Sequence, residues 1–407
     1  MVRRVLQISL QADPLATVDG GKTGGQQVLV RQVARSVQMQ GYGTDVVTLR
    51  DNAHDRPQFS LGPIGQVVRL DVDDMPVHDP DWLNVVDEIS QKLLYYIRRE
   101  GRIYQIIHSH YWTSGLVAAR VAKELGVPWI HTPYKLAQWI VRQGEKISAV
   151  RDTAELEILN QVDAVVVSYL GEGDLIRRYA PDVTVYVVPP GVEPTQFFSR
   201  DAGPILKRLS LSRRPAIYIG RLTSGRGIEM LLQTLSEIQL PSAFCLAIVG
   251  GASGEVVNGY PVSPKLRALK ERLNEQVRFL GPMPHSAVAP YLAAASVMVA
   301  PNQGPTLGMA VVEGMASGLP VVGTDVTGIR DWISDGVDGV LVRPEQLDMA
   351  ATALLQLWSD SGRARRMGRI GQDRIHRHYG GDKMAEQLVQ IYQEVMEHGR
   401  HSAGVGY

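Results

Sequence analysis

The sequence predicts an α/β protein made of two doubly wound, Rossmann-like parallel-sheet domains that face an interdomain cleft. Its 407 residues are enough for two domains or more at about 150 residues each. Short apolar runs alternate with helix-length amphipathic segments along the chain, which is typical of βαβ units. The segment Val188-Pro189-Pro190-Gly191-Val192 interrupts this alternation with residues that break periodic structure. We therefore expect two domains hinged near Pro190.

The first apolar run, 5–10, follows two basic residues but is short and contains Gln7, so we interpret it as a buried strand and not as a signal peptide. The further expected strands are 45–49, 67–70, 103–108, 127–131, 164–167 and 183–188, then 215–219, 244–249, 277–280, 297–300, 320–322 and 339–342. The predicted domains are 1–190 and 191–375, with 376–407 as a helix that returns to the first domain and a loose tail. Ligands of such sheets bind at the carboxyl ends of the strands, which here would line the cleft.

Composition excludes several classes of protein. The 42 basic and 42 acidic residues cancel, and 44% hydrophobic against 21% charged residues is typical of a globular chain. We expect no nucleic-acid partner. No apolar run reaches the roughly 18 residues of a membrane helix, and one cysteine forms no internal disulfide. The expected protein is cytoplasmic with no membrane span; its oligomeric state stays open, a homo-oligomer included.

A glycine-rich segment, Asp19-Gly20-Gly21-Lys22-Thr23-Gly24-Gly25, precedes the first expected helix. Glycines at a helix N-terminus let backbone N–H groups approach an anion. One alternative is a flexible surface loop. Another is the P-loop of an NTPase, because 16–23 spells A-x-x-x-x-G-K-T. A P-loop starts directly from its strand, however, whereas 11–17 intervenes here.

In the second predicted domain, the first expected strand, 215–219, is followed by Gly220-Arg221-Leu222-Thr223-Ser224-Gly225-Arg226-Gly227 and then by a helix. Two arginines beside a helix N-terminus suit a diphosphate, the alternative being two solvated arginines. A further helix begins after Gly304, and its Glu313 could accept two hydroxyls of a ribose, unless it simply faces solvent. Gly250-Gly251 is a weaker candidate for close approach of the backbone to a ligand.

Polar side chains end two expected strands of the first domain, in His108-Ser109-His110-Tyr111-Trp112 and His131-Thr132-Pro133-Tyr134-Lys135. We interpret the histidines as polar cleft lining, because no third metal ligand stands at a suitable spacing. Asp71-Val72-Asp73 spells the D-x-D of some metal-dependent sugar transferases. We interpret it as a strand end and expect no metal site.

Together these motifs resemble the retaining glycosyltransferases of GT-B architecture, the family of sucrose synthase, sucrose-phosphate synthase and the mycothiol-pathway N-acetylglucosaminyl inositol-phosphate transferase. The resemblance runs from Val5 to about Tyr379. It rests on seven segments in the family's order: GGKTGGQQV, HSHYWTSG, RDTAE, VVPPGVE, GRLTSGRGI, IVGGASG and TLGMAVVEGMASGLPVV.

The resemblance implies a nucleotide-sugar donor, most often UDP-linked, on the second domain and an acceptor on the first. Arg221 matches the family's diphosphate arginine, and Arg226 stands where a lysine is usual. Glu313 matches the glutamate that holds the ribose. The donor site implied further includes Gly20, Gly21, Gly24, Gly25, Gly250, Gly251, Leu307, Gly308 and Met309. Tyr111 and Arg151 match contacts to an acceptor phosphate, and Lys135 would join them in a dianion site, unless Arg151 pairs with Asp152 or Glu155 and Lys135 is solvated.

Two residues depart from the family. Pro305 replaces the first of two paired glutamates, and Tyr134 replaces the active-site histidine and cannot titrate near pH 7. We predict a metal-independent hexosyltransferase without a cofactor, in which Arg221, Arg226, Tyr134 and Glu313 act in the transfer. It would move a hexose, glucose first, from a UDP-sugar to a sugar or sugar-phosphate acceptor, as sucrose-phosphate synthase does. The alternatives are a catalytically impaired nucleotide-sugar-binding paralogue with a regulatory or partner role, and an NTPase.

Overall fold

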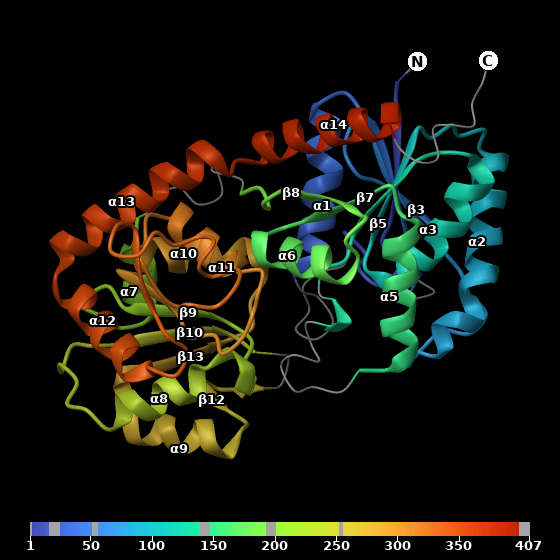
Figure 1. Ribbon diagram of the computed structural model, residues 1–407. Helices are drawn as coiled ribbons and strands as arrows, with labels where there is room; N and C mark the ends of the chain where they lie inside the picture. The colour runs from blue at the N-terminus through green and yellow to red at the C-terminus, as the bar shows by residue number, and fades with distance from the viewer. Residues whose placement is uncertain are drawn as a thin grey trace. The chain divides into compact units, whose positions relative to one another are not determined.

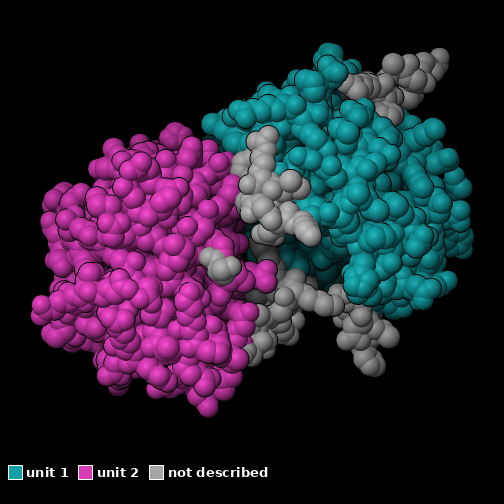
Figure 2. Space-filling model, turned by 60° about the horizontal axis from the view of Figure 1, so that its bottom comes forward, with its two compact units in different colours: residues 1–16, 24–191, 381–407 teal, residues 17–23, 192–380 magenta. Residues whose placement is uncertain are grey.

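A computed structural model describes residues 2–15, 25–50, 56–134, 136–138, 147–192, 201–251 and 255–398. The chain divides into two compact units, drawn in different colours in Figure 2. The described residues of the first unit lie within 2–191 and 381–398, and those of the second within 192–380. The chain therefore leaves the first unit at the predicted Pro-Pro-Gly break and returns to it with its last helix.

The first unit contains one sheet of eight strands in the order β3-β4-β2-β1-β5-β6-β7-β8. Figure 1 labels β3, β5, β7 and β8 of this sheet. All neighbouring strands are parallel except β3 and β4. Its elements are β1 (Arg4–Ile8), α1 (Gly25–Met39), β2 (Gly43–Leu49), β3 (Gln58–Ser60), β4 (Gly65–Leu70), α2 (Asp81–Arg99), β5 (Ile106–His110), α3 (Trp112–Leu125), β6 (Trp129–Thr132), α5 (Ala149–Gln161), β7 (Ala164–Val167), α6 (Leu170–Tyr179), β8 (Thr184–Val187) and α14 (Gly381–His398).

Successive residues of the central strands pack into hydrophobic cores on opposite faces of the sheet, because side chains alternate between the two faces. Leu6 of β1 packs with residues of α2, α3 and α5, whereas Val5 packs with residues of α1 and α14. Helix α14 buries the apolar stripe Met384, Leu388, Ile391, Tyr392 and Val395 in this second core. Its burial there explains why a helix after residue 380 belongs to the first unit.

The second unit has a six-stranded parallel sheet in the order β13-β10-β9-β14-β15-β16. Residues of α8, α9 and α12 cover one face, and residues of α10 and α11 cover the other. Its elements are α7 (Gly203–Arg208), β9 (Ala216–Gly220), η2 (Ser224–Arg226), α8 (Ile228–Ser236), β10 (Leu246–Gly250), β11 (Val256–Val257), β12 (Tyr260–Pro261), α9 (Pro264–Leu273), η3 (Asn274–Gln276), β13 (Val277–Gly281), α10 (His285–Ala294), β14 (Val297–Ala300), α11 (Met309–Ala316), β15 (Val321–Thr324), β16 (Gly339–Val342), α12 (Leu347–Ser359) and α13 (Ser361–His378).

The predicted fold class is confirmed, and β7, β14 and β16 have the predicted bounds. Three short strands were missed. Strand β3 is three exposed residues, which carry no alternating burial signal. Strands β11 and β12 form a hairpin around Asn258-Gly259, both with positive φ, a turn signal that could have predicted it. In the described part of the chain, no helix is both long and apolar enough to span a membrane.

Candidate functional site

In the second unit, β9 and β14 are neighbours whose connections lead to opposite sides of the sheet. At such a switch point the loops after the two strands diverge and leave a crevice at their carboxyl ends. The turn after β9 carries Arg221 and Arg226, and the loop after β14 leads to α11 with Glu313. The sheet order thus brings two separate predicted motifs to one place.

Direct contacts join these two loops. Gly227 has a φ of 68°, and a Cβ there would lie 1.7 Å from the Pro301 carbonyl oxygen, so only glycine permits this approach. The Gln303 N–H donates to the Gly225 carbonyl at 3.0 Å. Arg226 Nη1 donates to Thr306 Oγ1 at 2.7 Å. The Arg226 guanidinium is therefore held at the loop that precedes α11.

Arg221 lies directly after β9, and its side chain is exposed. The Tyr218 hydroxyl donates to its carbonyl oxygen at 2.7 Å, which fixes the backbone of the turn. Within the described residues its guanidinium makes no hydrogen bond or ion pair. An exposed guanidinium without a partner among the described residues fits both interpretations from sequence, a cation available to an anionic ligand and a solvated arginine.

The turn before α11 is shaped by a tryptophan. Gly308 has a φ of 73°, and a Cβ there would lie 2.8 Å from Trp332 Cδ1. Trp332 Nε1 donates to the Leu307 carbonyl at 2.9 Å. Among the described residues, the N–H groups of Leu307, Gly308 and Met309 have no acceptor. Unpaired donors at a helix N-terminus favour an anion.

Glu313 does not face solvent, contrary to the alternative considered from sequence, because the residue is only 6% exposed. Its Oε1 lies 2.7 Å from Nε2 of His285, the first residue of α10. Sequence reasoning missed His285. No motif marks it, and the contact depends on how α10 and α11 pack on the same face of the sheet.

The other predicted donor residues have different outcomes. A Cβ at Gly250 would lie 2.1 Å from the Gly220 carbonyl oxygen, and the Gly251 N–H donates to that oxygen at 3.1 Å. Both glycines are thus accounted for by the close pairing of β9 and β10. Gly25 begins α1. Gly20, Gly21 and Gly24, the P-loop-like segment 16–23 and Lys135 lie outside the described residues.

In the first unit, a buried histidine network lies at the carboxyl ends of β5 and β6. Both ring nitrogens of His108 are hydrogen-bonded, Nδ1 with Tyr392 Oη at 2.7 Å and Nε2 with Thr132 Oγ1 at 2.9 Å. Burial lowers the pKa of His108 to about 3, so the ring is neutral at pH 7. The histidines that were predicted to line the cleft are buried and hydrogen-bonded within the first unit. In the described chain no cluster of three metal-ligating side chains occurs.

Tyr134 joins this network through His110. The Tyr134 hydroxyl lies 2.9 Å from His110 Nδ1, and the two rings are stacked with centroids 5.8 Å apart. Burial, together with the nearby charge of Glu172, raises the pKa of the Tyr134 phenol. Its backbone has a φ of 62°, which is uncommon for a residue other than glycine. Tyr134 is therefore a fixed, neutral hydrogen-bonding group.

Arg151 and Tyr111 are brought together as predicted. The Arg151 guanidinium carbon lies 5.0 Å from the centre of the Tyr111 ring, a cation–π distance. Arg151 Nε also donates to Glu155 Oε1 at 2.8 Å, and Glu155 Oε2 accepts from the Ala137 N–H at 2.6 Å. The ion pair with Glu155, one of the alternatives considered from sequence, is thus present.

The D-x-D carboxylates pair with cations of this chain at the surface. Asp71 accepts from Arg50, and Asp73 lies 3.4 Å from Lys92 Nζ. Their side chains are 60% and 88% exposed. This agrees with the interpretation of the motif as a strand end.

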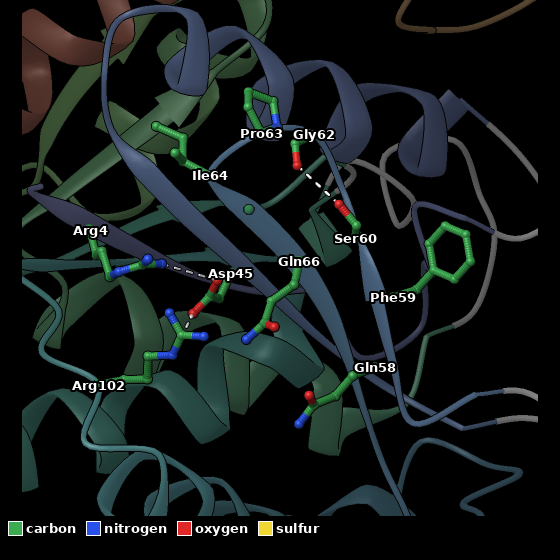
Figure 3. A pocket seen from close by; sticks show the side chains of 11 residues that line it. Arg4, Asp45, Gln58, Phe59, Ser60, Gly62, Pro63, Ile64, Gln66 and Arg102 are labelled. Carbon is green, nitrogen blue, oxygen red and sulfur yellow. Dashed lines mark hydrogen bonds and ion pairs between the residues drawn. The ribbon is translucent and has the colours of Figure 1, made fainter.

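A cavity of about 360 Å³ lies at the amino-terminal ends of β1, β2 and β4 (Figure 3). Arg4 and Arg102 point toward Asp45 there, at 3.4 and 3.9 Å from its oxygens (Figure 3). Asp45 is fully buried and also accepts from the Tyr104 hydroxyl at 2.7 Å. These cations compensate a buried carboxylate, and the cavity lies at the amino-terminal edge of the first unit's sheet, away from the carboxyl ends of its strands.

Comparison with known proteins finds two family domains in the chain. Residues 24–191 match the family described as glycosyl transferase 4-like domain, and residues 213–360 match glycosyl transferases group 1. D-inositol 3-phosphate glycosyltransferase from Thermobispora bispora is 30% identical, with 100% of this chain and 98% of that protein covered. D-inositol 3-phosphate glycosyltransferase 1 from Catenulispora acidiphila is also 30% identical, and the alignment covers 98% of this chain and 97% of that protein.

Among solved structures, sucrose-phosphate synthase from Thermosynechococcus elongatus superposes with a TM-score of 0.84 at 25% identity, over 97% of this chain and 99% of that one. HepE from Anabaena, solved in complex with UDP and glucose, shares the fold with a TM-score of 0.72 at 15% identity, over 96% of this chain and 100% of that one. The two parallel-sheet units, the two domain matches and a relative aligned over 98% of its length all indicate the same family. The chain belongs to the glycosyltransferases of GT-B architecture, with a glycosyl transferase 4-like domain followed by a group 1 domain.

Proposed function

We propose that this glycosyltransferase moves glucose from UDP-glucose to a hydroxyl group of a phosphorylated sugar or cyclitol, without a metal ion. The names of its relatives support a phosphorylated polyol acceptor, because they are D-inositol 3-phosphate glycosyltransferases. The sucrose-phosphate synthase and the HepE complex with UDP and glucose support a UDP-linked glucose donor.

One observation carries the proposal: the anion site at the switch point of the second unit. Arg226 is tied to Thr306 beside the unpaired N–H groups of Leu307, Gly308 and Met309, with the exposed Arg221 on the neighbouring turn. Arg226 and the backbone N–H groups are held in place before any ligand binds. Preorganised donors of this kind stabilise the charge that develops on a diphosphate leaving group. Glu313 would accept the two ribose hydroxyls.

In the proposed reaction, the acceptor oxygen bonds to the anomeric carbon on the face from which UDP departs. The bond between that carbon and the phosphate oxygen breaks, and the leaving diphosphate takes the acceptor proton. The products are a glycoside of retained configuration and UDP. No side chain needs to titrate in this scheme, so a neutral Tyr134 that donates a hydrogen bond is compatible with it.

The loss of a carboxylate at Pro305 is compatible with turnover. One missing hydrogen-bonding group costs about 1 to 3 kcal/mol, or about one to two orders of magnitude in rate. The diphosphate site does not depend on that carboxylate. We therefore propose an active transferase and not an impaired paralogue.

On the first unit, Tyr111 and Arg151 would contact the acceptor phosphate, with Lys135 as a further cation. The ion pair with Glu155 orients the guanidinium, which lies against the Tyr111 ring. Guanidinium groups bind phosphate in a bidentate manner. The names of the relatives, and not these contacts, carry the proposal of a phosphorylated acceptor, because Arg151 is 7% exposed and already paired with Glu155.

The test is to incubate the purified chain with UDP-, ADP- or GDP-glucose and with fructose, fructose 6-phosphate, inositol or inositol 3-phosphate. Nucleotide release and the anomeric configuration of the product, read by NMR, are the measurements. We expect UDP release and an α-linked product only with a phosphorylated acceptor. A rise in the melting temperature of the protein with UDP-glucose, without any product, would support the impaired paralogue. Hydrolysis of ATP in a separate incubation would support the NTPase.

A further inference from the structure

The pair formed by His285 and Glu313 has an uneven exposure. The Glu313 side chain is 8% exposed, whereas the His285 side chain is 32% exposed. Glu313 lies in α11, whose N-terminus carries the proposed diphosphate donors, and His285 begins the neighbouring helix α10. A largely buried carboxylate is thus contacted by a ring that is accessible from solvent.

The chemistry of the contact sets its direction. When the carboxylate is ionised it only accepts hydrogen bonds, and the 2.7 Å contact is then made by the His285 tautomer that carries its hydrogen on Nε2 and donates to Oε1. A carboxylate offers about four lone-pair sites on two oxygens. One such bond therefore fixes the rotation of the Glu313 carboxylate and still leaves acceptor sites for two vicinal hydroxyls.

We propose that His285 is a positioning residue for the nucleotide: it holds the Glu313 carboxylate in the orientation that accepts the ribose 2′- and 3′-hydroxyls. The inference rests on the proposed nucleotide site. It adds a residue that acts on ribose recognition through Glu313, without itself contacting the reacting atoms. His285 thereby contributes to selection of ribonucleotides over deoxyribonucleotides.

A positioning role predicts an effect that depends on the ribose hydroxyls. We would measure the affinity of UDP and of 2′,3′-dideoxy-UDP by calorimetry for the wild type, His285→Ala and His285→Gln. His285→Ala should weaken UDP binding about tenfold, which is the scale of one hydrogen bond to a charged group. It should change the affinity for dideoxy-UDP less than twofold, because that nucleotide makes no ribose contact to lose.

His285→Gln is the conservative variant, since its amide N–H can donate to the carboxylate, and it should retain most of the preference for UDP. His378→Ala is the matched control, an exposed histidine of the same unit. An equal loss for both nucleotides, or no loss for either, overturns the role of His285 while leaving the nucleotide site intact. Failure of the wild type to bind UDP overturns the proposed function and this inference with it.

Discussion

Arg226 Nη1 donates a hydrogen bond to Thr306 Oγ1 at 2.7 Å, and this contact joins residues 80 positions apart in the chain. One residue ends the turn after β9 and the other lies in the loop between β14 and α11. The guanidinium is therefore oriented before a ligand arrives. Preorganisation of this kind lowers the entropic cost of binding an anion.

Removal of that acceptor should weaken nucleotide binding without loss of charge. Thr306→Val keeps the shape of the side chain but cannot accept from Arg226. We expect UDP to bind about 2- to 10-fold more weakly, the scale of one ordinary hydrogen bond. Calorimetric titration measures the affinity, and Thr352→Val, on the exposed side of α12, is the control. An unchanged affinity would show that this contact does not position the guanidinium for a ligand.

Arg221 should contribute its charge directly. Arg221→Ala should cost about 1.5 to 3 kcal/mol of UDP binding, the range for a hydrogen bond to a charged group. The free energy of unfolding should not change, because the side chain is exposed and has no partner among the described residues. Arg272→Ala, an exposed arginine of α9, controls for general loss of positive charge. Equal affinities of the Arg221 variant and the wild type would contradict the diphosphate assignment.

The sequence predicted the sheets and the segments of the site better than the contacts within the site. Strand β7 could be predicted from sequence because an apolar run bounded by polar residues is a local signal. The pair His285–Glu313 spans 28 positions, and it forms because two helices cover one face of the sheet. The burial of Glu313 was missed for the same reason, since a glutamate in a helix usually faces solvent.

Metal independence is tested most simply with a chelator. Turnover should survive excess EDTA, because the proposed diphosphate site uses arginines and backbone N–H groups in place of a metal cation. Asp71→Asn combined with Asp73→Asn should change kcat/KM less than twofold, since both carboxylates pair with surface cations. Restoration of an EDTA-treated enzyme only by Mg²⁺ or Mn²⁺ would favour the D-x-D interpretation instead.

The acceptor prediction requires a variant that leaves no buried charge unpaired. Arg151→Ala alone would strand Glu155, which is 3% exposed and bonded to Arg151. The double variant Arg151→Met with Glu155→Gln replaces the pair by neutral side chains, and Glu155→Gln alone is its control. We expect the wild type to prefer a phosphorylated over a free acceptor by about 10- to 100-fold in kcat/KM. The double variant should lose that preference and keep its UDP affinity. Equal use of both acceptors by the wild type would mean that the acceptor is neutral.

Glu172 should make the stability of the protein depend on pH. This residue of α6 is only 2% exposed, and its Oε1 has no hydrogen-bond partner among the described residues. Burial raises the pKa of this carboxyl to about 8, although the Ser168 N–H opposes the shift. An unfolded glutamate titrates near pH 4.3, at about the value of a model peptide. The folded state therefore binds more protons than the unfolded state between about pH 4.3 and pH 8.

Stability from Glu172 is thus fully present below about pH 4.3 and is lost as pH rises through 8. Glu172→Gln cannot ionise, so its stability relative to the wild type should increase from pH 5 to pH 9. The measurement is the free energy of unfolding in urea at pH 5, 7 and 9. The buried histidines, whose low pKa values destabilise the fold toward acid, affect both proteins equally and cancel in the difference. Glu157→Gln, at an exposed position of α5, should show no such trend. A difference that stays constant with pH would mean that Glu172 is ionised in the folded protein throughout this range.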